Sequence, residues 1–459
     1  MSHIDIKKGP IGSTLIKLSV PVLAGQVFNL LYNLVDTWFI ARIDTTDPWL
    51  VGATGLVFPI FFLFMATMFG ISGGISSLVA RAIGAGRSAE LGKTIESGLA
   101  LAIAAGILVL AIFYPTTDYL LGLFGGTDLI LEYGKSYLLW ILPAAPFMFL
   151  NAVFMGVLQG EGRTKHMMMA MLSGTLVNII LDPILIFSAG MGIAGAGFAT
   201  SIGNMASFVY LLVVFLKTGS EVTVEWKWQH VSLPVIAEIL RVGIPHSLIN
   251  FLSSISFIFY NRIMIAINPM ILTSFTLYSR IEQFSLVPIW SMMGGLGAIA
   301  GQAAGAGDFS RMRQSARTAS IMGLVINGSL LALYVLFGNQ IFMLFQSDAE
   351  VLSIARIILP WMAGGTFVSV PIFMIGTVMT SAGFASRNLA LTAIRIYALN
   401  VPACAIAAAL FRGQLAPVMA AIFGSAIIAL FMMIGAHKVF MNGLESGRLT
   451  IKYGAKQAG

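Results

Sequence analysis

The sequence has 459 residues, 58% of them hydrophobic, and a mean hydropathy of +0.91. Only 10% of the residues are charged, which excludes an ordinary soluble globular protein. The formal net charge is +7, but the basic residues gather in the loops between apolar stretches, so nucleic acid is not an expected partner.

Apolar stretches long enough to cross a bilayer recur along the whole chain. The start of the chain carries charges but no cleavable apolar segment, so the first helix is expected to be retained. The fold class predicted is all-α integral membrane, with twelve transmembrane helices near 14–43, 51–80, 94–115, 135–158, 167–188, 192–216, 235–267, 270–302, 316–338, 351–379, 388–411 and 415–440.

The first predicted helix contains an acid and a proline. Asp36 ends a stripe of polar residues at helical spacing, formed with Gln26, Asn29 and Asn33. An ionisable group at membrane depth costs roughly 3 kcal/mol or more, so it indicates a functional site. Pro21 removes one backbone hydrogen bond and is predicted to form a hinge, with bending of the helix coupled to protonation of Asp36.

The fifth and sixth helices carry similar stripes. Thr175, Asn178 and Asp182 share one face of the fifth, and Thr200 and Asn204 share one face of the sixth. Lipid offers these groups no hydrogen-bond partners, so the stripes are expected to face one another or water.

The depths of these residues support a shared pocket. At 1.5 Å per residue, Asp36 lies about 10 Å, Asp182 about 9 Å and Thr200 about 12 Å from the outer ends of their helices. Two close carboxylates repel in a medium of low dielectric constant, so the pair must hold a proton or a cation. Na⁺ would accept the oxygen ligands of Asp36, Asn178, Asp182 and Thr200, which form the metal site only if Na⁺ is the coupling ion. No cofactor is expected.

The chain repeats itself across its longest polar connection. The predicted domains are an N-lobe at 1–216, a cytoplasmic linker at 217–234 and a C-lobe at 235–459. Each lobe holds six helices, and short segments match in order, with LSVPV at 18–22 resembling VGIPH at 242–246. Because six is even, the repeats are parallel, and a substrate path is expected between two pseudo-symmetric bundles.

The second half lacks acids where Asp36 and Asp182 would map. Its buried charges are Arg280 and Glu282, two residues apart and therefore not facing each other. Glu282 is equally consistent with binding a cationic group and with a structural pair. The candidate cavity-lining residues are Gln26, Asn29, Tyr32, Asn33, Thr175, Asn204, Arg280 and Glu282.

The charge distribution predicts the topology. Only four Lys or Arg fall in the predicted outer loops, at positions 42, 135, 356 and 412, and most of the rest flank the opposite helix ends. The positive-inside rule then places both termini in the cytoplasm, in a multi-pass protein of the cell membrane.

Other chemistry finds little support. The segment GAGFAT at 195–200 opens a membrane helix and follows no strand, so it does not indicate a nucleotide site. No phosphate-binding loop, nucleophile–base pair or metal-ligand spacing is present in the sequence, which argues against a membrane enzyme or an ATP-driven pump.

Several motifs together resemble a known family. They are GPIGSTLIKLSVPV at the start, LYNLVDTWFIAR around Asp36, ISSLVARAIGAG, GVLQGEGRTKH, and LVNIILDPILIF around Asp182. The chain resembles a multidrug and toxic compound extrusion (MATE) transporter of the DinF-like bacterial and archaeal branch, over essentially all twelve helices.

The resemblance implies export of small organic, often cationic, compounds in exchange for H⁺ or Na⁺ by a V-shaped, outward-open pair of bundles. In that branch the residues matching Asp36, Asn178, Asp182 and Thr200 form the cation site, and helix 1 bends near the residue matching Pro21. Another branch carries an acid on helix 7, where this chain reads LINFLSSISF at 248–257 and has no acid. The protein is expected to be a monomer in the lipid bilayer.

The sequence fits two other classes of transporter less well. A lipid-linked oligosaccharide or peptidoglycan-precursor flippase of the same superfamily would need a strongly cationic cavity, and only Arg280 is a convincing mid-membrane cation. A major-facilitator transporter would carry an acidic–basic cluster after its second helix, which ARAIGAGRSAELGKT does not match.

Overall fold

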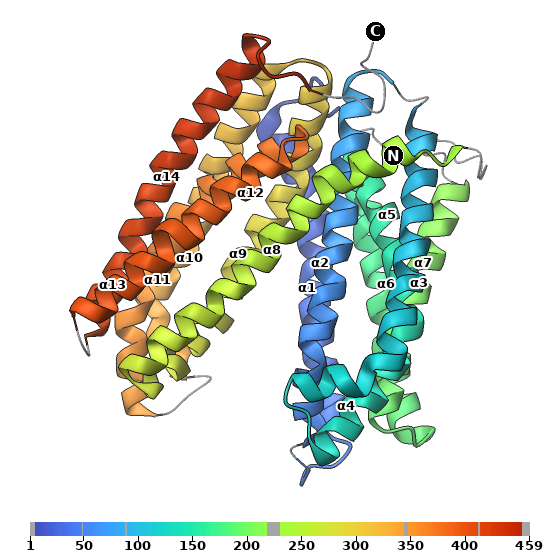
Figure 1. The fold of residues 1–459 in the computed structure, drawn as a ribbon, viewed down its shortest axis with the longest axis vertical. Helices are drawn as coiled ribbons and strands as arrows, with labels where there is room; N and C mark the ends of the chain where they lie inside the picture. The colour runs from blue at the N-terminus through green and yellow to red at the C-terminus, as the bar shows by residue number, and fades with distance from the viewer. Residues whose placement is uncertain are drawn as a thin grey trace. The chain divides into compact units, whose positions relative to one another are not determined.

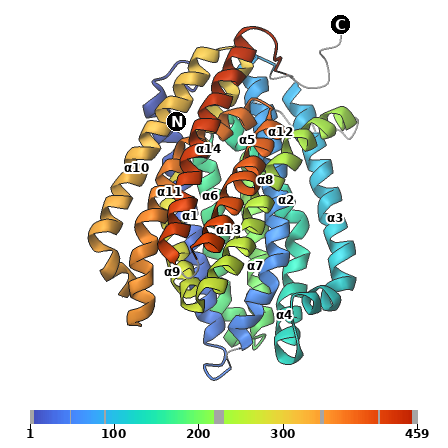
Figure 2. The same ribbon diagram turned by 60° about the vertical axis from the view of Figure 1, so that its left-hand side comes forward.

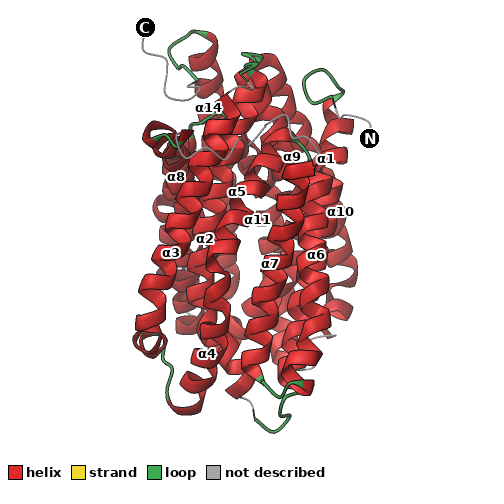
Figure 3. Ribbon diagram, turned by 90° about the vertical axis from the view of Figure 1, so that its right-hand side faces the viewer, coloured by secondary structure: helices red, strands yellow, loops and turns green. Residues whose placement is uncertain are grey.

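The computed structural model describes residues 5–47, 49–87, 90–217, 230–343, 348–411 and 414–451, although only the backbone is described at Arg280, Val335 and Asn339. Within these ranges the secondary structure is entirely helical, with short connecting loops (Figure 3). In the described part of the chain twelve helices are long and apolar enough to cross a membrane, and this confirms the predicted fold class.

The helices of the first half follow the chain in order from blue to green in Figure 1. They are α1 (Ile11–Ala41), α2 (Trp49–Gly84), α3 (Leu91–Leu123), α4 (Asp128–Ile141), η2 (Leu142–Ala144), α5 (Ala145–Glu161), α6 (Thr164–Pro183), η3 (Ile184–Ser188) and α7 (Ile193–Lys217).

The second half continues with α8 (Leu233–Ile267), α9 (Pro269–Gly305), α10 (Phe309–Met343), α11 (Ala349–Ser381), α12 (Ala385–Ala393), η5 (Ile394–Asn400), α13 (Val401–Leu410) and α14 (Leu415–Glu445). Helices α10, α11 and α14 run side by side in Figure 2, and α11 also packs against α9.

Some predicted helix ends were wrong, and prolines account for two of the differences. The third helix was expected to end at Pro115, but α3 continues to Leu123. A proline within a helix removes one hydrogen bond and need not end the helix when the residues beyond it are apolar. The fourth span is interrupted instead, by the single 3-10 turn η2, which contains Pro143.

Helices that occupy corresponding places in the two halves share an irregularity. After Pro183, α6 continues as the π-helical segment η3, and α12 joins α13 through the π-helical segment η5, which ends two residues before Pro402. A proline that cannot donate its backbone hydrogen bond favours such wider turns. The shared irregularity agrees with the internal repeat inferred from the sequence.

The chain forms two compact units whose boundaries lie inside helices. One, here the first-half unit, consists mainly of Val20–Ile244. The other, the second-half unit, consists of Pro245–Tyr453 together with Met1–Ser19. The predicted boundary, the linker at 217–234, lies elsewhere, and its residues 218–229 fall outside the described part of the chain. The division of the chain into lobes and linker stays a prediction.

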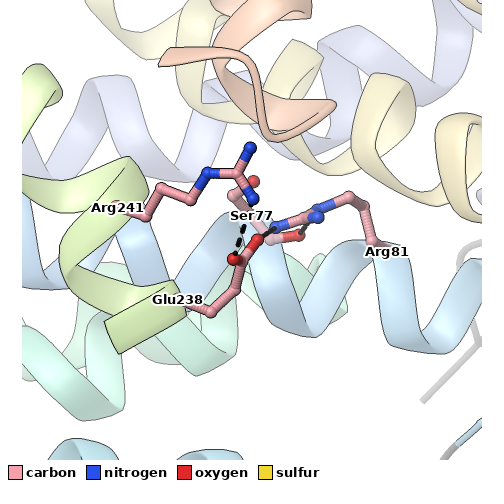
Figure 4. Close-up of polar contacts among 4 residues, drawn as sticks. All are labelled: Ser77, Arg81, Glu238 and Arg241. Carbon is pink, nitrogen blue, oxygen red and sulfur yellow. Dashed lines mark hydrogen bonds and ion pairs between the residues drawn. The ribbon is translucent and has the colours of Figure 1, made fainter. Parts of the chain in front are cut away.

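The start of α8 is attached to the first-half unit by charged and backbone contacts (Figure 4). Glu238 lies between two arginines, with Oε1 3.7 Å from Arg81 Nη2 and Oε2 3.3 Å from Arg241 Nη1. Arg81 is 1% exposed, and its Nε donates to the Ser77 carbonyl oxygen. Because a buried charge needs a partner, this pairing fixes the first turns of α8 on α2.

The start of the chain is attached to the second-half unit in a comparable way. Arg311 Nη2 donates to the carbonyl oxygens of Ile6 and Gly9, at 2.6 and 2.8 Å. Leu15 and Leu18 are fully buried in a core shared with α9, α10, α11 and α14. The unit boundaries within α1 and α8 follow from these contacts.

Candidate functional site

The two acids predicted to form the site are both buried in the first-half unit. Asp36 is 8% exposed and Asp182 is fully buried. They come from α1 and α6 and are close enough for their charges to interact. The structure thus places two carboxyl groups, from helices far apart in the sequence, in one apolar region.

A hydroxyl group on α7 links the surrounding side chains. The Asn178 amide nitrogen donates to Thr200 Oγ1 over 3.4 Å. The hydroxyl of Tyr32, one helical turn before Asp36, lies 3.2 Å from the same oxygen. Thr200 therefore holds side chains of α1 and α6 in fixed positions beside the acids.

A close approach of two helix backbones makes this geometry reachable. A Cβ atom added at Gly203 of α7 would lie 2.8 Å from the Gly174 carbonyl oxygen and 3.1 Å from Asn178 Cβ. Only residues without a side chain let α6 and α7 approach this closely. The glycines therefore bring Asn178 within reach of Thr200.

The helix that carries Asp182 changes its winding immediately beyond the acid. Pro183 follows Asp182 directly, and the next five residues are the π-helical segment η3. π-Helical turns are rare and occur frequently at functional sites, because they redirect side chains relative to a regular helix.

Four oxygen atoms in this region are buried without a hydrogen-bond donor among the described residues. They are one carboxyl oxygen of Asp36, both carboxyl oxygens of Asp182 and the amide oxygen of Asn178. An ionised carboxylate in such surroundings is costly unless it is neutralised. All four atoms are oxygens, so they could bind a proton shared by the acids or act as ligands of a hard monovalent cation.

Sequence reasoning missed Tyr137. This α4 residue is 8% exposed and lies near Thr200, Tyr32 and both acids. Its position in α4 gave no polar stripe at helical spacing like those that contain Asp36 and Asp182. The only available indication was that a buried tyrosine hydroxyl usually requires a hydrogen-bond partner.

The polar stripe of α1 is divided by the structure. Tyr32 turns toward Thr200 and Asp36 is buried, whereas Asn29 and Asn33 are exposed, and the Asn33 amide nitrogen donates to the Asn29 carbonyl oxygen. Gln26 is partly buried. Asn29 and Asn33 therefore do not join the two acids in the first-half unit.

The other candidate residues lie on α6, α7, α1 and α9. Thr175 is buried on α6, one turn before Asn178, and the Asn204 amide nitrogen donates to the Thr200 carbonyl oxygen. Pro21 lies well inside α1, which begins at Ile11. Glu282 lies in the second-half unit, on α9. The side chain of Arg280 lies outside the described part of the structure.

Two kinds of sequence comparison link the chain to known proteins. A family model described as MatE matches residues 21–184 and 245–406, one stretch in each half. The chain is 25% identical over 412 residues to the multidrug export protein MepA of Staphylococcus aureus (strain MSSA476), covering 88% of this chain and 89% of that protein. It is 27% identical over 344 residues to the probable multidrug resistance protein YoeA of Bacillus subtilis (strain 168), covering 73% and 74%.

Solved structures agree in fold. The structure described as the outward-facing conformation of a multidrug resistance MATE family transporter of the MOP superfamily matches with a TM-score of 0.90 and 25% identity. The match covers 97% of this chain and 99% of that one. A MOP superfamily transporter from Pyrococcus furiosus matches with a TM-score of 0.88 at 24% identity, over 97% and 99% of the two chains, which shows likeness of fold alone.

Proposed function

Because the chain belongs to the MatE family, we propose that this multi-pass membrane protein is a secondary active efflux antiporter. It exports organic, often cationic, compounds in exchange for H⁺ or Na⁺. Multidrug export and multidrug resistance are the functions named for its relatives MepA and YoeA, and this supports the proposal.

The observation that carries the mechanism is the set of four buried oxygen atoms without a donor. Asp36 and Asp182 contribute three of them and Asn178 the fourth. Two carboxylates at membrane depth cannot both stay ionised without a positive charge between them. Binding and release of that charge is the chemical event of an exchange cycle, and it occurs in a region that Thr200 and Tyr32 hold rigid.

Exchange also requires the site to change its access. Pro21 interrupts the hydrogen-bond ladder of α1 fifteen residues before Asp36. In the proposed cycle, neutralising Asp36 changes the electrostatic interactions between α1 and the neighbouring helices. The helix then bends at Pro21. A cationic substrate competes for the same carboxylates, so the ion and the substrate are bound alternately. Both termini lie in the cytoplasm in this scheme.

The direct test is efflux of a fluorescent cationic dye from proteoliposomes under a pH gradient or a Na⁺ gradient imposed separately. Transport under one gradient alone identifies the coupling ion. Asp36→Asn and Asp182→Asn should each lower coupled efflux at least tenfold, because an amide can neither release a proton nor balance a cation. Full coupled transport by Asp36→Asn would refute the mechanism.

Asp44→Asn is the matched control. Asp44 is an exposed loop acid after α1, whose pKa is lowered by hydrogen bonds from the Thr46 hydroxyl and backbone N–H. The same chemical change outside the site should leave efflux unaltered. Absence of dye movement under both gradients, with the wild-type protein verified as folded, would instead indicate a different transported substrate class.

A further inference from the structure

Glu282 is a membrane-embedded acid that the proposed cycle does not use. It lies within the candidate span Pro269–Gly305 and is partly buried. Among the described side chains no Lys, Arg or His forms an ion pair with it. An acid at this depth is costly unless its charge is compensated, so its surroundings indicate how it is used.

Two hydroxyl groups surround the carboxyl group. Thr366 Oγ1 of α11 makes a short hydrogen bond with Glu282 Oε1. The Tyr278 hydroxyl, one turn earlier on α9, lies 3.4 Å from Thr366 Oγ1 and close to the carboxyl group. Thr366 Oγ1 also lies 3.1 Å from the Met362 carbonyl oxygen. The acid is therefore part of a hydrogen-bonded chain that ends on the backbone.

This chain of groups satisfies the acid in both of its protonation states. When Glu282 is ionised, Thr366 donates to it and the Tyr278 hydroxyl can donate to Thr366. When Glu282 is protonated, it can donate to Thr366, whose single hydroxyl proton then turns to the Met362 carbonyl oxygen. Neither state leaves a buried donor or acceptor without a partner, so the site accepts a proton without rearranging the helices.

A small cavity lies beside Tyr278 and Thr366, the hydroxyl groups next to the acid, although Glu282 itself does not line it. Ser285, Asn327, Tyr334, Tyr278 and Thr366 are among its lining residues, and the Ser285 and Tyr334 hydroxyl groups lie 2.7 Å apart. Its volume is about 10 Å³, close to the smallest that holds one water molecule. This space suits proton transfer through a water molecule and is far too small for an organic compound.

We propose that Glu282 is a second proton-binding site, located in the second-half unit, which takes up and releases a proton through this cavity independently of Asp36 and Asp182. The groups that face it are Tyr278 on its own helix, Tyr334 on α10 and Thr366 on α11. None of these is charged at neutral pH, so the response of the site to pH belongs to Glu282.

The test is infrared difference spectroscopy of the full-length purified protein between acidic and alkaline pH. It is carried out in an Asp36→Asn/Asp182→Asn background, which removes the first pair of acids. A carbonyl band from a protonated carboxylic acid should remain in this background and titrate with pH. The same band should vanish when Glu282→Gln is added. Because the readout is spectroscopic, it does not depend on whether the protein exports a drug.

Two further variants make the result specific. Glu350→Gln changes an exposed acid in the first turn of α11 and should leave the band intact. Thr366→Val removes the hydroxyl partner and should shift the midpoint of the titration, which also tests the proposal if Glu282→Gln does not fold. A band that is unchanged by both Glu282→Gln and Thr366→Val would overturn the proposal. So would a band that disappears with Na⁺ but does not respond to pH.

Discussion

At the scale of single residues, this protein combines acids that bind charge with neutral groups that hold them in place. Asp36 and Asp182 bind the exchanged charge in the proposed cycle, and this role depends on their burial. Thr200 is different, because it contributes a single oxygen atom that contacts side chains from two other helices. Removing such a group disturbs the position of the acids without changing their charge.

Thr200→Val should therefore separate position from charge. Valine keeps the shape but leaves the Asn178 amide and the Tyr32 hydroxyl without their shared partner. The loss of a buried hydrogen-bond partner typically costs about 1–3 kcal/mol. We expect a lower thermal unfolding temperature and reduced dye efflux. Thr200→Ser retains the hydroxyl and should restore most of the transport; equal losses in both variants would show that packing of the methyl group matters instead.

At the scale of elements, the site depends on how closely α6 and α7 approach and on where α1 can bend. Gly174 and Gly203 allow the first, through contacts that leave no room for a side chain. Pro21 is the basis of the second. Both features lie in helices whose apolar residues would form a membrane span without them.

Gly203→Ala should force α6 and α7 apart. The added methyl group would meet the backbone of Gly174 rather than a flexible side chain, and overpacking of this kind costs about 1–3 kcal/mol. The thermal unfolding temperature and the rate of dye efflux should both decrease. Gly55→Ala is the matched control, because nothing lies within 4 Å of a Cβ added at that exposed position of α2. That control should be neutral or slightly stabilising.

Pro21→Ala tests the proposed hinge. Alanine restores the backbone N–H that completes the helical hydrogen bond to the Lys17 carbonyl oxygen, so α1 becomes straighter and stiffer. The variant should be at least as stable to heat as the wild type, yet show at least tenfold slower coupled efflux. Pro59→Ala makes the same change inside α2, at an exposed position, and should transport normally. Equal transport by the two variants would argue against a hinge at Pro21.

At the scale of the whole molecule, the chain is a duplicated set of six spans. The family model matches one stretch from Pro21 and another from Pro245, and the two compact units divide next to the same prolines. The halves have nevertheless diverged in chemistry. The first-half unit carries the pair of buried acids, whereas the second-half unit carries Glu282 within a hydrogen-bonded chain.

The predicted topology can be tested by labelling introduced cysteines, because the single native cysteine is buried. Cys404 is fully buried, so a membrane-impermeant maleimide should not label the wild-type protein in intact cells. Asp44→Cys, in a predicted outer loop, should be labelled. Lys7→Cys, near the predicted cytoplasmic terminus, should react only after the membrane is permeabilised. The opposite pattern would invert the orientation derived from the positive-inside rule.

The membrane spans, the internal repeat and the two acids could all be predicted from the amino-acid sequence. A bilayer imposes a fixed length of apolar residues, and burying an acid there is so costly that its position in the sequence is informative. For this reason the twelve spans were predicted within several residues and confirmed. Asp36 and Asp182 stood out without any knowledge of their neighbours.

Which polar groups contact one another could be seen only once the helices were packed together. Periodicity placed Asn29 and Asn33 on the same face as Asp36, yet they are exposed, and Tyr32 turns toward Thr200 instead. Neither Tyr137 nor the Thr366 hydrogen bond to Glu282 was marked by a periodic pattern in the sequence. Such contacts depend on the distance between neighbouring helices and on their rotation, which are set by packing at glycines such as Gly203. The spacing of residues along one helix carries no information about how the next helix packs against it.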